Sequence, residues 1–406
     1  MAGAGYKLFA TGDVLTAAQV NTYLNEQTVM VFADSAARTT ALSGVLAEGM
    51  MSYLQDTNAV EVYNGTAWVS VGGAAPTITN KNYLINGGFA IAQRGTSFTA
   101  SNNNDDAYTL DRWYILSDTN DVIDVTQNTS TVPTNGQFAI ALDVETVNKK
   151  FGIATIIENK DVIGLIGNTV TFSFKAKVSA TTKLDNVKAA IVAWSGTADT
   201  VTSDIVSAWN VEGTNPTLIA NATYENSPVN LNLTTSYATY SVSAAVDTAS
   251  AKNIILFIWS DVTDTTLGDF LYIAESKLEL GSTATAFEYA GGTIQGELAA
   301  CQRYFQKTND QSEVPGAAPS LTPINAINAS STLVVGVPPF KVVMRTAPTV
   351  TLYSPVTGTS GKIRSGGADR DGTASDIGEF AVGYIASTGL TAGSNSTIAY
   401  AASAEL

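Results

Sequence analysis

The sequence predicts a mainly β protein. It has a small α+β N-terminal unit, a central antiparallel jelly-roll sandwich, a short linking helix and a C-terminal β-sandwich-like domain. Short segments rich in β-branched and aromatic residues recur along most of the chain, separated by turn residues. No long amphipathic helix lies between them. Only 14% of the 406 residues are charged, against about 25% in an average protein. This balance suits β-rich proteins with polar but weakly charged surfaces.

Residues 1–75 are predicted to form the first unit. Thr16 and Gln19 have the spacing of a capping box, in which each side chain bonds the other's backbone amide at the start of a helix. A second short helix is expected over residues 35–42. Asn64 begins an Asn-Gly pair, the strongest short signal for a hairpin. The strands expected around it cover residues 50–54, 60–63 and 67–71.

A Gly/Ala/Pro-rich linker at residues 71–77 separates the first unit from a jelly roll predicted over residues 76–290. Residues 170–178 alternate between apolar and polar side chains, with the period of two of a half-buried strand. The near-continuous apolar runs 189–194 and 254–259 are expected as central strands of a sandwich. Further strands are expected over residues 236–242 and 271–280.

A linking helix is predicted over residues 291–307. Ile294, Leu298, Cys301 and Phe305 share one face of it, which indicates a docking surface. Cys301 is expected as a buried small apolar residue, because free cysteine is among the most buried residue types.

Residues 308–406 are predicted to form the C-terminal β-domain. The Gly-rich stretch 360–373 is expected to be a polar loop, and such loops carry binding residues more often than framework residues. Strands are expected over residues 333–337, 341–353, 380–385 and 396–402.

The overall charge and residue usage disfavour several classes of function. The net charge of −15 offers no basic patch dense enough to neutralise a nucleic-acid backbone. The chain has no histidine, which removes Ser-His and Cys-His dyads and histidine-ligated zinc. A single cysteine allows no intrachain disulfide. No apolar run reaches the roughly 18 residues of a membrane span, and no signal peptide is evident.

The run from Asn82 to Trp113 resembles a module that opens β-sandwich domains in bacteriophage tail-fibre and related virion proteins. Residues 277–288 resemble the end of a carbohydrate-binding-like jelly roll in phage fibres, and residues 297–305 the helix that follows it. Residues 12–68 resemble the virion-proximal N-terminal segment of such proteins. Residues 344–350, with the final Ala-Glu-Leu, resemble their C-terminal β-domain. Within the opening run, the Gly-Gly break and the Asp-Arg-Trp sequence are interpreted as framework.

The resemblance implies a homotrimeric phage tail fibre, made in the host cytoplasm and assembled into the virion. Residues 1–75 would attach it to other tail or baseplate proteins. The β-domains would project toward a host cell-surface polysaccharide. Candidate trimer-packing residues are Val20, Leu24, Leu298 and Phe305.

Candidate glycan-binding residues lie where polar loops meet aromatic or charged side chains. Trp209 is flanked by polar residues and is the tryptophan expected to be exposed, whereas Trp194 and Trp259 end apolar runs and are expected in the core. The other candidates are Asp105 and Asp106 in the Asn/Asp-rich loop, and Asp369 and Arg370 in the Gly-rich stretch.

No catalytic site is predicted, so the chain is expected not to be an enzyme. Paired carboxylates could hydrolyse a glycosidic bond. The candidates, however, all lie in turn segments where aspartate bonds backbone amides. No cofactor is expected, although structural calcium stays open because these loops are rich in oxygen ligands. The carboxylates considered are Asp105 with Asp106, and Asp261, Asp264 and Asp269.

Two alternative functions stay open. One is a structural virion protein without receptor binding, such as a baseplate, head-decoration or head-fibre component. The other is a glycan-degrading tail spike. The chain shows no repeat at solenoid spacing, so a parallel β-helix is not supported.

Overall fold

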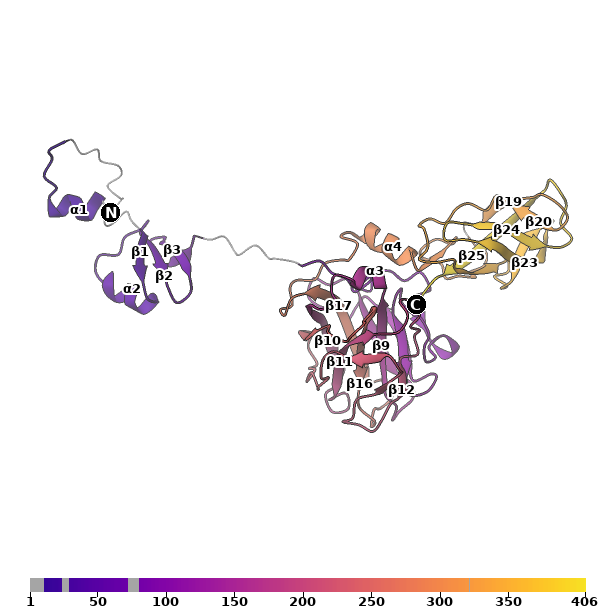
Figure 1. The fold of residues 1–406 in the computed structure, drawn as a ribbon, viewed down its shortest axis with the longest axis horizontal. Helices are drawn as coiled ribbons and strands as arrows, with labels where there is room; N and C mark the ends of the chain where they lie inside the picture. Colours follow the sequence, from indigo (N-terminus) through magenta and orange to yellow (C-terminus); the bar gives the residue numbers. More distant parts are fainter. Residues whose placement is uncertain (1–10, 24–28, 72–79, 321) are drawn as a thin grey trace. The chain divides into compact units, whose positions relative to one another are not determined.

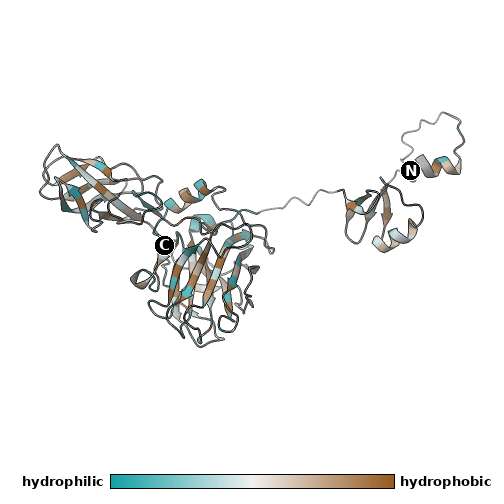
Figure 2. Cartoon of the chain, turned by 180° about the vertical axis from the view of Figure 1, so that it is seen from behind, coloured by the Kyte–Doolittle hydropathy of each residue, from teal (hydrophilic) through white to brown (hydrophobic). Residues whose placement is uncertain are grey.

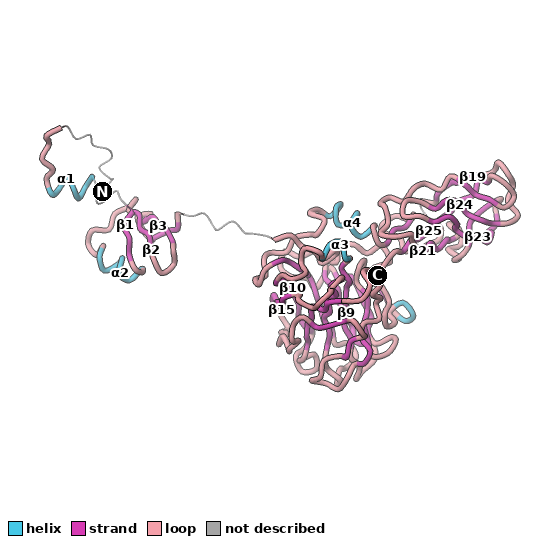
Figure 3. Tube along the Cα trace, viewed as in Figure 1, coloured by secondary structure: helices cyan, strands magenta, loops and turns pink. Residues whose placement is uncertain are grey.

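The structure, a computed structural model, describes residues 11–23, 29–71, 80–320 and 322–406 (Figure 1). The chain divides into two units, residues 1–78 and 79–406. Over the described residues, strands far outweigh helices, which confirms the mainly β prediction (Figure 3). The predicted linker lies almost entirely outside the described residues. In the described part of the chain, no helix is long and apolar enough to cross a membrane.

The described residues of the first unit form two short helices and a four-stranded sheet. Thr16 N donates to Gln19 Oε1 at 3.1 Å and Gln19 N donates to Thr16 Oγ1 at 3.3 Å, so the predicted capping box is confirmed. Asp34 caps the second helix by accepting from Ala37 N at 2.7 Å. Strand β1 was not predicted, and it pairs in parallel with β2. The elements are α1 (Ala17–Tyr23), α2 (Ser35–Ala41), β1 (Val29–Phe32), β2 (Met51–Leu54), β3 (Ala59–Tyr63) and β4 (Trp68–Ser70).

The second unit begins with a sandwich of two antiparallel sheets. One sheet has the strand order β15-β10-β17-β8-β7-β5 and the other β14-β11-β16-β9-β6. Figure 2 shows apolar residues gathered along these strands. The strands are β5 (Ser97–Phe98), β6 (Tyr114–Ser117), β7 (Ile123–Asn128), β8 (Ala139–Val144), β9 (Phe151–Ile157), β10 (Thr169–Val178), β11 (Val187–Trp194), β14 (Ala222–Tyr224), β15 (Ala238–Ala245), β16 (Asn253–Ser260) and β17 (Phe270–Leu280).

The sandwich encloses one large core, and additional segments cover parts of its outer faces. Alternate residues of β10, among them Val170, Phe172 and Phe174, point into the core between the sheets. The hairpin of β12 (Val206–Ala208) and β13 (Thr217–Leu218) belongs to a second apolar cluster, on the opposite face of the five-stranded sheet. Short helices lie at the one-turn segment 100–102 and at α3 (Asn159–Val162). The apolar runs in β11 and β16 contribute to the large core on one face of their sheet and to the second cluster on the other, so both runs are buried on two sides.

The linking helix is shorter than predicted. Helix α4 (Ile294–Gln302) begins after Thr293, whose side chain accepts from Gly296 N. It ends before Phe305, which lies in strand β18 (Phe305–Lys307) and pairs with β25. Cys301 is buried, as expected. The prediction that Phe305 belongs to the helix is wrong, because its backbone pairs with a strand almost one hundred residues later.

The prediction of a sandwich-like C-terminal domain is refined by the strand pairings, which close into a ring. The order β25-β19-β20-β24-β23-β22 returns to β25, because β22 also pairs with β25. The C-terminal half of β25, residues 399–403, pairs with β18 and β21 instead. The strands are β19 (Ile324–Asn328), β20 (Leu333–Val335), β21 (Thr349–Tyr353), β22 (Lys362–Ser365), β23 (Ala368–Ile377), β24 (Val382–Ser387) and β25 (Asn395–Ser403).

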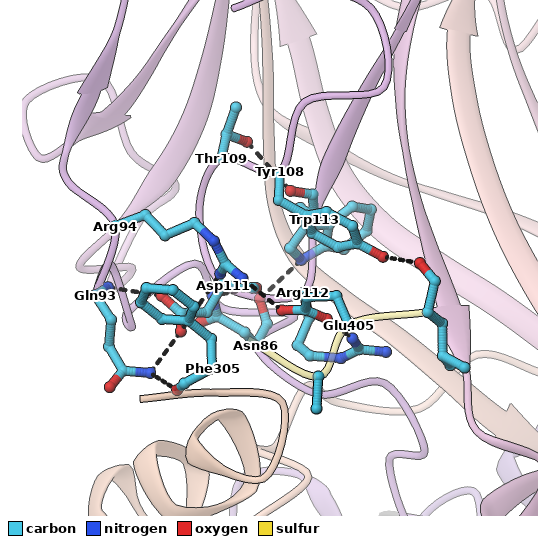
Figure 4. Close-up of polar contacts among 12 residues, drawn as sticks. Asn86, Gln93, Arg94, Tyr108, Thr109, Asp111, Arg112, Trp113, Phe305 and Glu405 are labelled. Atoms are coloured by element: carbon cyan, nitrogen blue, oxygen red, sulfur yellow. Dashed lines mark hydrogen bonds and ion pairs between the residues drawn. The ribbon is translucent and has the colours of Figure 1, made fainter. Parts of the chain in front are cut away.

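A buried polar network joins the sandwich to the segment after β25 (Figure 4). Arg94 and Arg112 both form ion pairs with Glu405, the former at 2.9 Å. Gln93 donates from its backbone and its side chain to Asp111, each at 2.6 Å. Gln93, Asp111 and Arg112 come from the opening run and are buried, which agrees with the interpretation of the Asp-Arg-Trp sequence as framework.

Aromatic rings cover the two arginines of this network. The Arg94 guanidinium lies 3.8 Å from the ring centre of Phe305, and that of Arg112 lies 3.6 Å from the ring centre of Tyr304. Each arginine therefore meets an ion-pair partner and an aromatic face, an arrangement that stabilises a desolvated cation.

Candidate functional site

Trp209 does not project as a free ligand-binding ring. It is only partly exposed, and its ring packs edge-on against Phe257 with centroids 5.9 Å apart. Phe257 in turn stacks on Trp259, which is fully buried in β16. Trp194 and Trp259 are core residues, as predicted. The polar neighbours of Trp209 reflect its place in the hairpin over the five-stranded sheet.

Asp105 and Asp106 lie near Asp204, whose negative charge acts on both of them. Asp105 accepts a hydrogen bond from Ser117 N at 2.7 Å, the turn-capping role considered for it. Asp106 Oδ1 is buried and has no hydrogen-bond partner. Burial, and then the negative charges of Asp105 and Asp204, raise the pKa of Asp106 to about 7. The Asp106 carboxyl group is therefore protonated over much of the acidic range.

The raised pKa of Asp106 predicts a pH-dependent stability difference. Between about pH 4 and pH 7 the folded chain keeps a proton that the unfolded chain releases, so this group's contribution to stability falls as pH rises. An Asp106→Asn variant should therefore gain melting temperature relative to the unchanged protein between about pH 5 and pH 8. Asp376→Asn, at an exposed position, sets the baseline. A difference that shrinks over this range would contradict the prediction.

Asp369 and Arg370 lie in strand β23, not in a loop. Gly366 and Gly367 both have positive φ, and they form the two-residue turn between β22 and β23. Asp369 accepts from Ser354 Oγ and Thr357 Oγ1, so it serves the framework of the domain. Among the described contacts, none brings Asp369 or Arg370 to Trp209, Asp105 or Asp106. The predicted glycan-binding residues therefore do not form one site.

The candidate trimer-packing residues also separate. Val20 is partly exposed in α1, and Leu24 lies outside the described residues. Leu298 is partly buried in α4. Phe305 is 5% exposed and lies beneath the Arg94 guanidinium, so its ring is already packed within a single chain. The structure thus corrects the assignment of Phe305 to a trimer surface.

A distortion in β17 marks a different place on the sandwich. Ser173 pairs with Lys277, but Lys175 pairs with Ala274, so an extra residue of β17 forms a β-bulge. Glu275 occupies this bulge with φ +48°, in the left-handed region that non-glycine residues rarely adopt. Its carboxylate lies 2.8 Å from Lys175 Nζ. Such strain persists only where the surroundings enforce it, and it concentrates at functional sites.

The Gly-Gly pair of the opening run supports this bulge. Ser276 N donates to Gly87 O at 2.8 Å. A methyl group on Gly87 would lie 1.9 Å from Ser276 O, so only glycine allows this approach. A methyl group on Gly88 would lie 2.9 Å from Cε1 of Tyr289 and 3.1 Å from Cζ of Phe287. The pair therefore places both the bulge and two aromatic rings.

Two adjacent cavities flank the bulge. One, of about 160 Å³, is lined by residues that include Lys175, Thr239 and Thr285. The other, of about 180 Å³, is lined by residues that include Asn135 and Tyr289. Glu275 and Phe287 line both cavities and form the ridge between them. We call this feature the Glu275 groove, defined by Lys175, Glu275, Phe287, Tyr289 and Asn135.

The Glu275 groove combines apolar rings with groups that donate and accept hydrogen bonds. Phe287 and Tyr289 are partly exposed and pack edge to face, with centroids 5.4 Å apart. Lys175 provides an ammonium group, Glu275 a carboxylate and Asn135 an amide. Among the described residues that line the two cavities, Glu275 is the single carboxylate. The groove can therefore bind a ligand that has apolar faces and many hydroxyl groups.

The same sheet face carries further aromatic residues beside the Glu275 groove. Lys177 pairs with Tyr272 across β10 and β17, and its Nζ lies 5.6 Å from that ring and 6.0 Å from Tyr237. Tyr237 donates to Thr131 O at 2.9 Å. This bond anchors the loop that supplies Asn135 to the groove, so the loop and the sheet face form one surface.

Sequence reasoning missed the Glu275 groove. Glu275 reads as an ordinary polar position in an alternating strand, and a bulge depends on register with β10 rather than on local sequence. The one usable signal was the Gly-Gly pair, because adjacent glycines after a strand start often mark a close approach of backbone. In the described part of the chain, no group of three or more His, Cys, Asp or Glu residues could hold a metal ion.

Comparisons with known proteins give remote similarities of fold. No family model matches the chain, and no curated protein matches it. The tailspike protein 4 enzymatically active domain of bacteriophage CBA120 matches at 16% identity and a TM-score of 0.29, over 45% of this chain and 21% of that one. The chain thus spans about a fifth of that tailspike's length.

Two further solved structures match at similar levels. A putative sugar-binding protein from Bacteroides thetaiotaomicron matches at 14% identity and a TM-score of 0.31, over 50% of this chain and all of that one. A carbohydrate-binding module of the β-sandwich superfamily matches at 10% identity and a TM-score of 0.32, over 55% of this chain and 72% of that one. At these scores the likeness supports no inference about function.

Proposed function

We propose that this chain is a virion appendage protein, a phage tail fibre, that binds a host surface glycan in the Glu275 groove without cleaving it. The observation that carries the proposal is the bulge at Glu275, which holds a strained charged residue between two cavities and beside two partly exposed rings. Sugar rings offer apolar C–H faces for such aromatic rings, and their hydroxyls pair with charged and amide groups.

The virion location rests on the sequence resemblance of residues 12–68 and 82–113 to tail-fibre modules. We propose a homotrimer that attaches through residues 1–75. Mass measurement in solution tests this, since a trimer has three times the 42.3 kDa of the chain. A stable monomer at micromolar concentration would contradict the trimer.

Two substitutions in the groove test glycan binding. Tyr289→Ala removes a ring and Lys175→Met removes an ammonium group while keeping most of the stem. Each should weaken binding to a printed array of bacterial O-antigen and capsular oligosaccharides by about tenfold, because each loses roughly one good contact. Tyr384→Ala, at a partly exposed tyrosine in β24, is the matched control. Wild-type affinity in both groove variants would refute the site.

The alternatives predict different results in the same experiments. A purely structural virion protein binds no glycan on the array. A glycan-degrading spike releases new reducing ends from the polysaccharide that it binds. The Glu275 groove favours binding alone, because glycoside hydrolysis ordinarily uses a pair of carboxyl groups and the described lining residues supply one.

A further inference from the structure

We infer that a third cavity, next to the Glu275 groove, is a subsite for an uncharged, hydroxyl-rich unit of the same glycan. The inference rests on the proposed function. The cavity measures about 510 Å³, within the range of roughly 300–1,000 Å³ typical of small-ligand pockets. Gln137 and Phe138 line both this cavity and the adjoining one of the groove. A linear ligand that leaves the groove past Phe138 therefore enters it.

The lining of this cavity is neutral, although the chain carries a net charge of −15. None of the described residues that line it is ionisable. Asp310, the exposed neighbour of Gln311 along the chain, is not among the lining residues, and two other nearby carboxylates have partners of their own. Glu297 accepts from Asn86 N and Gly291 N, and Glu313 accepts from Asn309 Nδ2. A charged ligand would lose hydration here and gain no counter-ion, so the lining selects against charge. The residues are Ala90, Ile91, Ala92, Thr96, Gln127, Gln137, Phe138, Ile294, Gln295, Leu298, Gln311 and Ser312.

Glutamine amides supply most of the polar groups of this cavity, beside the hydroxyls of Thr96 and Ser312. Four glutamines line it, and each amide both donates and accepts hydrogen bonds. Gln127 is held in place, since its Nε2 donates to Phe89 O at 2.6 Å. Gln295 and Gln311 are exposed and come from α4 and from the segment after β18. Sugar hydroxyls, which also donate and accept, match this pattern without a charged partner.

A second copy of the chain is the competing occupant, because Ile294 is 52% exposed on the same helix. A protein surface packed over four amides would have to satisfy many donors and acceptors at fixed positions. Hydroxyl groups on a sugar rotate to suit these positions. The amide-rich lining therefore favours the glycan, and the oligomeric state becomes one outcome of the test.

The test measures affinities of the full chain by calorimetry for uncharged gluco-, galacto- and manno-oligosaccharides and for uronate- and sialate-bearing ones. The double variant Gln295→Ala/Gln311→Ala should bind its uncharged oligosaccharide about tenfold more weakly, through loss of two hydrogen bonds. Ser312→Trp, which places a large side chain at an exposed lining position, should also weaken it. Gln55→Ala, at an exposed glutamine of the other unit, should not.

Several results would overturn the inference. One is that no uncharged oligosaccharide binds. Another is that the cavity variants bind it with unchanged affinity. A third is that Ser312→Trp changes the mass in solution without changing glycan affinity, which would indicate that a second copy of the chain occupies the cavity. The two proposals separate cleanly. Loss of binding in Tyr289→Ala but not in the cavity variants supports the Glu275 groove alone, and the reverse supports the cavity alone.

Discussion

A Gly87→Ala substitution should destabilise the second unit by about 3 kcal/mol and abolish the glycan binding that we propose for the Glu275 groove. The added methyl group would meet Ser276 O at 1.9 Å, and backbone atoms cannot move away as a flexible side chain can. Overpacking of this kind typically costs about 1–3 kcal/mol, and a clash with backbone belongs at the upper end. Relief of the clash requires Ser276 to shift, which removes the support of the neighbouring bulge at Glu275.

The midpoint of urea unfolding measures the loss of stability, and the glycan array measures the loss of binding. Gly164→Ala is the matched control, because a methyl group at Gly164 would have no neighbour within 4 Å. The prediction is refuted if the two alanine variants unfold at the same urea concentration. A variant that is destabilised but still binds fully would show that the bulge does not depend on Gly87.

A Glu405→Gln substitution should cost about 3–5 kcal/mol, the usual range when one partner of a buried ion pair is removed. Glu405 is the ion-pair partner of both Arg94 and Arg112, and the Arg112 side chain is 2% exposed. The glutamine keeps the shape and removes the charge, so the two arginines stay buried with less compensation. The rings of Tyr304 and Phe305, which lie over the guanidinium groups, make up for only part of the lost ion pairing.

Urea unfolding again provides the measurement, with Glu379→Gln at an exposed position as control. If the free energy of unfolding falls by less than about 1 kcal/mol, the ion pairs of Glu405 contribute no more than ordinary surface ion pairs do. A double variant, Arg112→Met with Glu405→Leu, separates charge from packing. It should recover stability relative to Glu405→Gln, because a buried pair replaced by apolar residues leaves fewer uncompensated charges.

Local signals in the sequence predicted local structure well. The capping box of Thr16 and Gln19 and the strand over residues 170–178 depend on neighbours within a few residues, and both are present. The strand is not half-buried as expected, because Thr171 and Ser173 on its polar face are buried as well. The assignment of Trp194 and Trp259 to the core followed from apolar runs of the same kind. Mainly β architecture follows from many such segments taken together.

Features set by distant pairing could not be predicted in this way. Phe305 continues the helical pattern of the sequence, but its backbone pairs with β25 and therefore forms a strand. Trp209 has polar neighbours along the chain and an aromatic neighbour, Phe257, across space. Glu275 acquires its conformation from register with β10 and from the approach of Gly87. The candidate site is therefore a product of tertiary structure, and its residues carry no local signature.

The closed ring of strands in residues 308–406 also limits how this domain can associate. An open sheet offers unpaired backbone groups at its margins, and these recruit strands from other molecules. In the ring β25-β19-β20-β24-β23-β22, every member hydrogen-bonds to two neighbours. Contacts between copies through these strands must therefore use side chains. The margins that remain in this domain belong to β18 and β21, each of which pairs with β25 alone among the named strands. Sheet growth from this domain is therefore confined to these two short strands.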